Sequence, residues 1–99
     1  MQLGRVIGTV TGTTKDRALT GHKLLVVELL DSASNVIESG RVAVDAAGAG
    51  FGDTVVVTSG SAARQTAGTT GVPTDLTIVM IVEELTVGGS KVPATKKGK

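Results

Sequence analysis

The side chains that could carry out nucleophilic catalysis in this chain are two serines and one histidine. Ser59 and Ser61 flank Gly60, and a serine hydroxyl attacks a substrate only when a neighbouring base removes its proton. The single histidine, His22, lies in a polar stretch next to Lys23, and neither serine lies in a Gly-x-Ser-x-Gly elbow. We therefore interpret Ser61 as the cap of a short helix and His22 as a solvated loop residue. A small hydrolase that uses these side chains is the weaker alternative.

The carboxylates do not form an acid–base pair in the sequence. Glu83 and Glu84 are adjacent on an expected strand, where consecutive side chains point to opposite faces. Asp45 and Asp53 flank a glycine-rich stretch, and either hydrogen bonds within that loop or helix capping explains both residues without catalysis. With no cysteine and one histidine, a zinc site built from those residue types is excluded. The sequence therefore predicts no catalytic residue, no metal, no cofactor and no enzymatic activity.

The glycine-rich stretch at residues 48–52 (GAGFG) superficially resembles a nucleotide-binding loop. A dinucleotide fingerprint opens a helix, because the pyrophosphate binds at the helix N-terminus, whereas this stretch continues through Asp53 into a valine-rich strand. We interpret its small residues as a place where two backbones approach closely, within the fold or between subunits. Arg64 could hold an anion or a carboxylate of another subunit, or it could be an ordinary surface arginine, and the sequence leaves this open.

The elements that position these residues are mostly strands. Val, Ile and Thr make up a third of the 99 residues and Gly accounts for 14, which favours strands joined by tight turns. Alternating glycines in the first strand indicate sharp curvature or close approach by another backbone, as in a small barrel. One helix is expected at residues 62–67, capped by Ser61 and ended by Gly68. The expected strands span residues 3–13, 23–30, 36–38, 41–45, 54–58 and 76–82, with a hairpin turn at 31–35 and an extension at 85–87.

Composition excludes several functional classes. The net charge is only +1 and Phe51 is the only aromatic residue, so a nucleic-acid surface is not expected. An OB-type binding module for nucleic acid or oligosaccharide remains the alternative, although it lacks the aromatic rings on which bases stack. No apolar run approaches the ~20 residues of a membrane span, and no signal peptide is evident at the start. We expect a cytoplasmic protein with no membrane and no nucleic-acid partner.

Two strands have apolar residues on both faces, and this pattern predicts self-association. The strand at 23–30 is interrupted only by Glu28, and the strand at 76–82 is similarly apolar. The barrel core can cover only one face of each strand, so something else must cover the other. A chain this short also buries a limited share of its surface. These observations predict a homo-oligomer without fixing its symmetry.

Three stretches of this chain resemble the bacterial microcompartment vertex proteins, the EutN/CcmL family. The most specific one combines the Gly48–Gly50 loop with a Gly-Ser-Ala-Ala-Arg segment. Asn35 stands where the family often has a turn glycine, and Thr74 and Met80 also depart from the usual residues. The matching residues are 3–10 with Lys15, Leu19, Gly21 and 23–27; then 44–50, Gly52, Asp53 and 59–65; and finally Pro73, Asp75 and the strand ending at 81–82.

The resemblance implies a non-enzymatic structural shell protein. It implies an all-β, OB-like barrel at residues 1–93 with one short helix. The lysine-rich sequence at 94–99 itself indicates a polar, flexible tail, and the resemblance implies nothing about it. The resemblance further implies a cyclic homopentamer that caps the vertices of a polyhedral bacterial microcompartment, with hexameric shell proteins as its partners. By the same resemblance, subunit contacts or the five-fold axis are expected at Gly48, Ala49, Gly50, Ser59, Gly60, Ser61, Ala62, Ala63 and Arg64.

Overall fold

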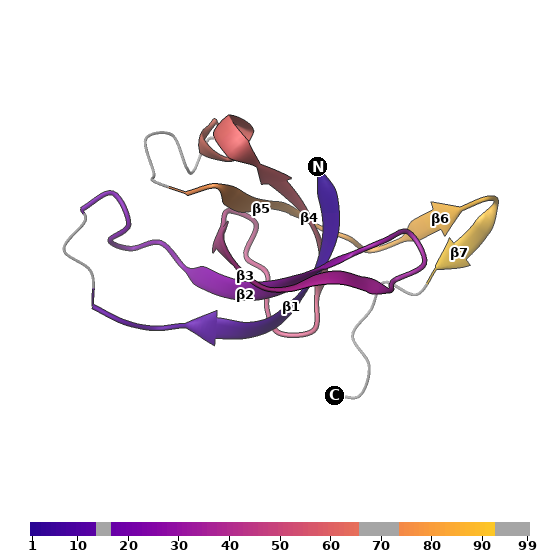
Figure 1. The fold of residues 1–99 in the computed structure, drawn as a ribbon, viewed down its shortest axis with the longest axis horizontal. Helices are drawn as coiled ribbons and strands as arrows, with labels where there is room; N and C mark the ends of the chain where they lie inside the picture. Colours follow the sequence, from indigo (N-terminus) through magenta and orange to yellow (C-terminus); the bar gives the residue numbers. More distant parts are fainter. Residues whose placement is uncertain (14–16, 66–73, 93–99) are drawn as a thin grey trace.

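The structure is a computed structural model that describes residues 1–13, 17–65 and 74–92. Seven strands and one short helix follow one another along these residues (Figure 1). The expected end of the helix at residues 66–68 and the tail at 94–99 lie outside the described residues. The elements are β1 (Gln2–Val10), β2 (Leu24–Leu30), β3 (Val36–Asp45), β4 (Thr54–Ser59), the 3₁₀ helix η1 (Gly60–Arg64), β5 (Leu76–Ile81), β6 (Leu85–Val87) and β7 (Ser90–Val92).

The first five strands close into a barrel with the order β1-β2-β3-β5-β4. Every neighbouring pair is antiparallel except β3 and β5, which run parallel, with Val44 opposite Thr77. This order confirms the expected OB-like, all-β barrel. Strand residues that point inward form a single apolar core. It contains Val6, Leu25, Val27, Leu29, Ala43, Ala49, Val55, Val57, Leu76 and Ile78.

A glycine in β1 allows the barrel to curve tightly. A Cβ atom at Gly4 would lie 3.1 Å from the carbonyl oxygen of Glu28 on β2, so only glycine fits there comfortably. The register of β1 against β2 then shifts between Val6 and Gly8, which places a bulge at Ile7. The prediction that glycine in the first strand marks close backbone approach is confirmed at Gly4.

The hairpin between β2 and β3 forms where it was predicted, around Asp31. The Asp31 carboxylate accepts hydrogen bonds from the backbone amides of Ala33 and Asn35, both at 2.9 Å. The left-handed residue of this turn is Ser34, with φ 68°, and Asn35, which stands where the family often has a turn glycine, does not have a positive φ.

The third strand is continuous, although two separate strands were expected. Gly40, at φ +80°, lies within it and not between two strands. Ser39 and Gly40 together oppose the single residue Glu28, which makes this position a β-bulge. A glycine with positive φ serves a turn and a bulge equally well, so the local sequence did not distinguish them.

The helix is shorter than expected and is of the 3₁₀ type. It begins at Gly60, its N-cap position is Ser59, and no side chain caps it, so the prediction that Ser61 is the cap is wrong. Beyond β5, strands β6 and β7 form a separate two-stranded hairpin, which projects from one end of the barrel in Figure 1.

Candidate functional site

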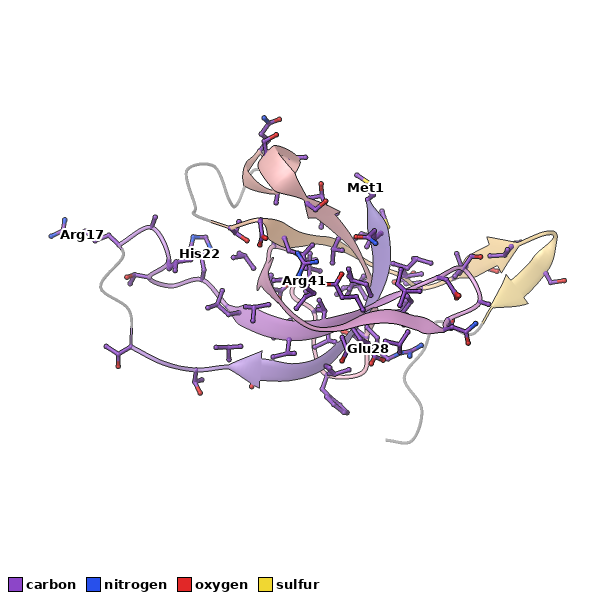
Figure 2. The ribbon with its side chains drawn as sticks, in the orientation of Figure 1. Met1, Arg17, His22, Glu28 and Arg41 are labelled. Atoms are coloured by element: carbon purple, nitrogen blue, oxygen red, sulfur yellow. The ribbon has the colours of Figure 1, made fainter. Side chains whose placement is uncertain are left out.

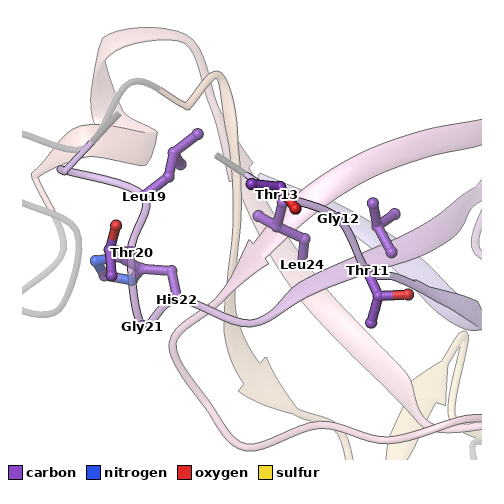
Figure 3. Close-up of a pocket in the computed structure, with 9 residues that line it drawn as sticks. Thr11, Gly12, Thr13, Leu19, Thr20, Gly21, His22 and Leu24 are labelled. Atoms are coloured by element: carbon purple, nitrogen blue, oxygen red, sulfur yellow. The ribbon is translucent and has the colours of Figure 1, made fainter. Parts of the chain in front are cut away.

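His22 lies at one end of the molecule, in the connection between β1 and β2 together with Arg17 (Figure 2). It lines a pocket of about 530 Å³ whose other walls are Val10, Thr11, Gly12, Thr13, Leu19, Thr20, Gly21 and Leu24 (Figure 3). Neither Ser59 nor Ser61 lines this pocket. The structure therefore does not bring the histidine and the serines into a common site. A serine nucleophile needs its base within hydrogen-bond reach, so this arrangement does not support the hydrolase alternative.

The described part of the chain shows no grouping of three His, Cys, Asp or Glu side chains that could hold a metal ion. Within the same residues, no helix has the length and apolar character needed to cross a membrane. Phe51 is 65% exposed on the β3–β4 loop, where a single ring offers one stacking surface and not a row of them.

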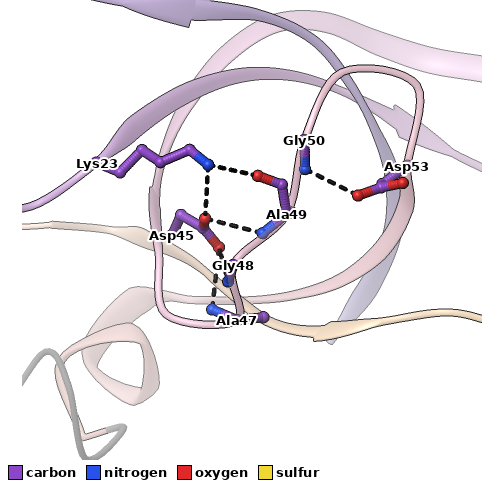
Figure 4. Close-up of polar contacts among 7 residues, drawn as sticks. All are labelled: Lys23, Asp45, Ala47, Gly48, Ala49, Gly50 and Asp53. Carbon is purple, nitrogen blue, oxygen red and sulfur yellow. Dashed lines mark hydrogen bonds and ion pairs between the residues drawn. The ribbon is translucent and has the colours of Figure 1, made fainter.

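The glycine loop between β3 and β4 is organised around the carboxylate of Asp45 (Figure 4). Its Oδ1 accepts hydrogen bonds from the amides of Ala47 at 2.9 Å and Gly48 at 3.0 Å, and its Oδ2 accepts one from Ala49 at 2.9 Å. The Asp45 side chain is only 2% exposed. A buried carboxylate that accepts several backbone amides fixes a loop because each of those amides would otherwise need another partner.

Lys23, the residue just before β2, completes this arrangement. Its Nζ lies 3.6 Å from Oδ2 of Asp45 and donates a hydrogen bond to the carbonyl of Ala49 at 2.7 Å. The sequence predicted Lys23 only as the beginning of a strand and did not predict this role. No local signal indicates it, because Lys23 and Ala49 are brought together only when β2 and β3 pair.

The other end of the loop is attached to β1. Gly52 donates its amide to the carbonyl of Val6 at 2.9 Å, and the Val6 amide donates to the carbonyl of Asp53 at 3.0 Å. The Asp53 carboxylate accepts the Gly50 amide at 2.8 Å. The loop-bonding interpretation of Asp45 and Asp53 is therefore confirmed, and the loop is fixed at both ends.

The 3₁₀ helix η1 is held by the start of β5. Thr77, which is fully buried, donates its hydroxyl to the carbonyl of Ala63 at 2.6 Å, and Gly60 donates its amide to the carbonyl of Asp75 at 3.0 Å. The neighbouring residue Ile78 accepts the amide of Ala46, the first residue of the glycine loop, at 3.0 Å. Adjacent residues of β5 thus anchor both segments that the resemblance singled out.

The residues expected at the subunit interface differ in how far they are exposed in the single chain. Ala49 and Ala63 are fully buried inside the single chain, so they support the loop and the helix from within. Gly50 is partly exposed and does not have a positive φ, and a Cβ there would come no closer than 3.9 Å to Asp53. The side chain of Arg64 lies outside the described parts of the chain. The exposed members are Gly48, Ser59, Gly60, Ser61 and Ala62.

Known proteins share this combination of a five-stranded barrel, a glycine loop and a short 3₁₀ helix. The model of the family described as "Ethanolamine utilisation protein EutN/carboxysome" matches residues 1–83. The carboxysome shell vertex protein CcmL of Synechocystis sp. is 44% identical over 87 residues, which cover 88% of this chain and 87% of that protein.

Solved structures of similar proteins share the fold. CcmL of Gloeobacter violaceus superposes with a TM-score of 0.86 at 36% identity and covers 95% of this chain and 97% of its own. The pentameric microcompartment shell protein GrpN of Rhodospirillum rubrum superposes with a TM-score of 0.77 at 42% identity, covering 88% of this chain and all of its own. The matched proteins are thus named as structural shell proteins and not as enzymes. The chain belongs to the EutN/CcmL family, which confirms the resemblance found in its sequence.

Proposed function

We propose that five copies of this chain form a ring that closes the vertices of a polyhedral bacterial microcompartment in the cytoplasm. The observation that carries the proposal is the structural match with the pentameric shell protein of Rhodospirillum rubrum, which this chain covers over its whole length. The shell vertex names of relatives at about the same identity point to the same role.

The function follows from shape and needs no catalytic group. A layer of hexagonal tiles is flat and closes into a polyhedron only where five-fold positions interrupt it. We propose that hexameric shell proteins surround each pentamer of this chain and contact its outer edge. Within the pentamer, the same contact repeated head to tail closes the ring, because each subunit meets its two neighbours through two different surfaces.

The first part of the glycine loop, up to Gly50, and the beginning of η1 are suited to the crowded region near a rotation axis. Their exposed positions carry no side chain larger than serine between Ser59 and Ala62, and Gly48 is exposed as well. Neither the backbone conformation nor the packing of the single chain requires glycine at position 50. A glycine there would allow the backbone of a neighbouring subunit to approach closely. We therefore propose that these segments, with Arg64, lie at subunit contacts or near the five-fold axis.

Co-expression with a hexameric shell protein tests this function. The experiment compares cells with and without this chain by electron microscopy. We expect closed polyhedra only in its presence, and tubes or open sheets in its absence. A matched pair of variants adds specificity: Gly50→Trp is expected to abolish closure, whereas Gly50→Ala, whose Cβ has ordinary space, is expected to retain it. Open sheets or tubes with the wild-type chain present would contradict the proposal.

A further inference from the structure

An apolar patch covers the outside of β1, β2 and β3 towards one end of the barrel. The strand register places Val10 opposite Leu24, and Val26 opposite Val42. Val42 is 46% exposed and Val10 is 36% exposed, while Leu24 and Val26 are half-buried. We call Val10, Leu24, Val26 and Val42 the β2 patch.

A second apolar patch lies across the outside of β1, β4 and β5. Leu3 stands opposite Val56, and Val56 stands opposite Met80. Met80 is 55% exposed, and Leu3 and Val56 are half-buried. We call Leu3, Val56 and Met80 the β4 patch. The two patches share only β1, and they use opposite ends of it, so they are different surfaces of one barrel.

Both patches have the composition of an interface core. Neither contains a charged side chain, and depletion of charge distinguishes the buried centre of an interface from its rim. The charged residues within β1 and β2 are Arg5 and Glu28, and they pair with each other at 3.5 Å. Exposed apolar strand residues of this kind are typical of a surface covered by another protein.

Each patch continues into one of the segments that we propose to lie at subunit contacts. Val42 lies in β3, which leads directly to Asp45 and the glycine loop. Met80 lies in β5, which anchors that loop through Ile78 and η1 through Thr77. This continuity indicates that the occupant of both patches is the same kind of molecule that meets the loop and η1, namely another copy of this chain.

We propose that in the ring the β2 patch of one subunit packs against the β4 patch of the next. A closed ring of more than two copies needs two different, complementary surfaces on every subunit, and these two patches fulfil that condition. If either patch met its own copy, the result would be a two-fold dimer and not a ring. The inference rests on the proposed pentamer and specifies which surfaces build it.

Chemical crosslinking tests this pairing within the intact assembly. The chain has no cysteine, so introduced thiols are the only reactive ones. We expect the double variant Val42→Cys/Met80→Cys, treated with a short bismaleimide, to give a ladder of linked subunits that reaches five. Either single cysteine variant is expected to give no ladder. The control Ile37→Cys/Met80→Cys pairs Met80 with a residue that is 58% exposed but outside both patches, and we expect no ladder from it.

Charge substitutions provide an independent readout. Val42→Glu and Met80→Glu each place a carboxylate in a patch, and each is expected to shift the pentamer entirely to monomer in light-scattering chromatography. Ile37→Glu is expected to remain pentameric. Circular dichroism tests whether each variant is folded. If a glutamate variant does not fold, the crosslinking of Val42→Cys/Met80→Cys tests the pairing of the two patches instead.

The outcomes separate this inference from the proposed function. A wild-type chain that forms no ring contradicts the proposed function itself. An intact ring in which the double cysteine variant forms no ladder overturns the pairing of the patches while the pentamer stands. Linked dimers from a single cysteine variant, or pentamers from both glutamate variants, overturn the pairing as well.

Discussion

Replacing Asp45 removes the acceptor around which the loop between β3 and β4 is built. Asp45→Ala takes away three charge-assisted hydrogen bonds at 2.9–3.0 Å from a side chain that is 2% exposed. Such bonds contribute about 1.5–3 kcal/mol each when buried. Because Gly48 is exposed, its amide regains water, so we expect a total loss of about 3–5 kcal/mol in the free energy of unfolding.

Asp45→Asn separates the individual contacts. An amide oxygen placed at Oδ1 retains the bonds from Ala47 and Gly48, but an amide nitrogen at Oδ2 faces the N–H of Ala49, so donor meets donor. We expect a loss of about 2–3 kcal/mol. Lys23→Met removes the half-exposed cation together with its hydrogen bond to the Ala49 carbonyl, and we expect a loss of about 1–2 kcal/mol.

The assay is urea unfolding followed by far-ultraviolet circular dichroism, since the chain contains no tryptophan or tyrosine for fluorescence. Every variant is compared at the same protomer concentration, and a second concentration separates loss of the loop from loss of the ring. Asp31→Asn is the control, because Asp31 also accepts two backbone amides but lies in an exposed turn. Equal losses for Asp31→Asn and Asp45→Asn, or no loss for Asp45→Ala, would refute the reasoning.

Three further predictions concern the ring, the 3₁₀ helix and the hairpin turn. Gly50→Trp is expected to remain folded but to elute as a monomer in light-scattering chromatography. The control Thr86→Trp, which lies outside the residues that the family model matches, is expected to elute as a pentamer. Thr77→Val removes the buried hydroxyl that donates to Ala63 and is expected to cost about 1–2 kcal/mol in urea unfolding, and an unchanged midpoint would contradict this. A backbone hydrogen bond from the turn lowers the pKa of Asp31 below its ordinary value of 3.8. Its stabilisation is therefore complete above that value and is lost as pH falls through the lower folded pKa, so wild type is expected to lose more stability than Asp31→Ala on acidification below pH 3.8.

The sequence predicted the strands and turns well because their signals are local. Alternation in β1, the apolar run in β2 and the Asp31 turn depend on neighbouring residues alone. The parallel pairing of β3 with β5 closes the barrel, and it joins segments that are distant in sequence. The glycines of the first strand and the family resemblance predicted a small barrel, but no pattern in the sequence predicted this parallel pairing.

The 3₁₀ helix shows where local propensity fails. Ala62 and Ala63 are good α-helix formers, but the structure fixes Gly60 to Asp75 at the beginning of the turn and Ala63 to Thr77 near its end. Contacts with β5 and the residue before it therefore determine the geometry of this segment. No residue within the segment indicates from sequence that these contacts will form.

The expected interface residues show a second limit. A small side chain is favoured both inside a tight core and where two subunits approach, so sequence alone treats Ala49 and Gly48 alike. In the structure Ala49 is fully buried, while Gly48 is exposed on the same loop. Conversely, nothing in the sequence around Val42 and Met80 distinguishes them from inward-facing strand residues. Only the strand register shows that both face outwards.

Native mass spectrometry of the purified chain at micromolar concentration is a direct test of the proposed pentamer. We expect one dominant species with five times the mass of the subunit, since the apolar strand surfaces that a single barrel leaves uncovered are buried between copies. A stable, folded monomer under the same conditions would contradict it.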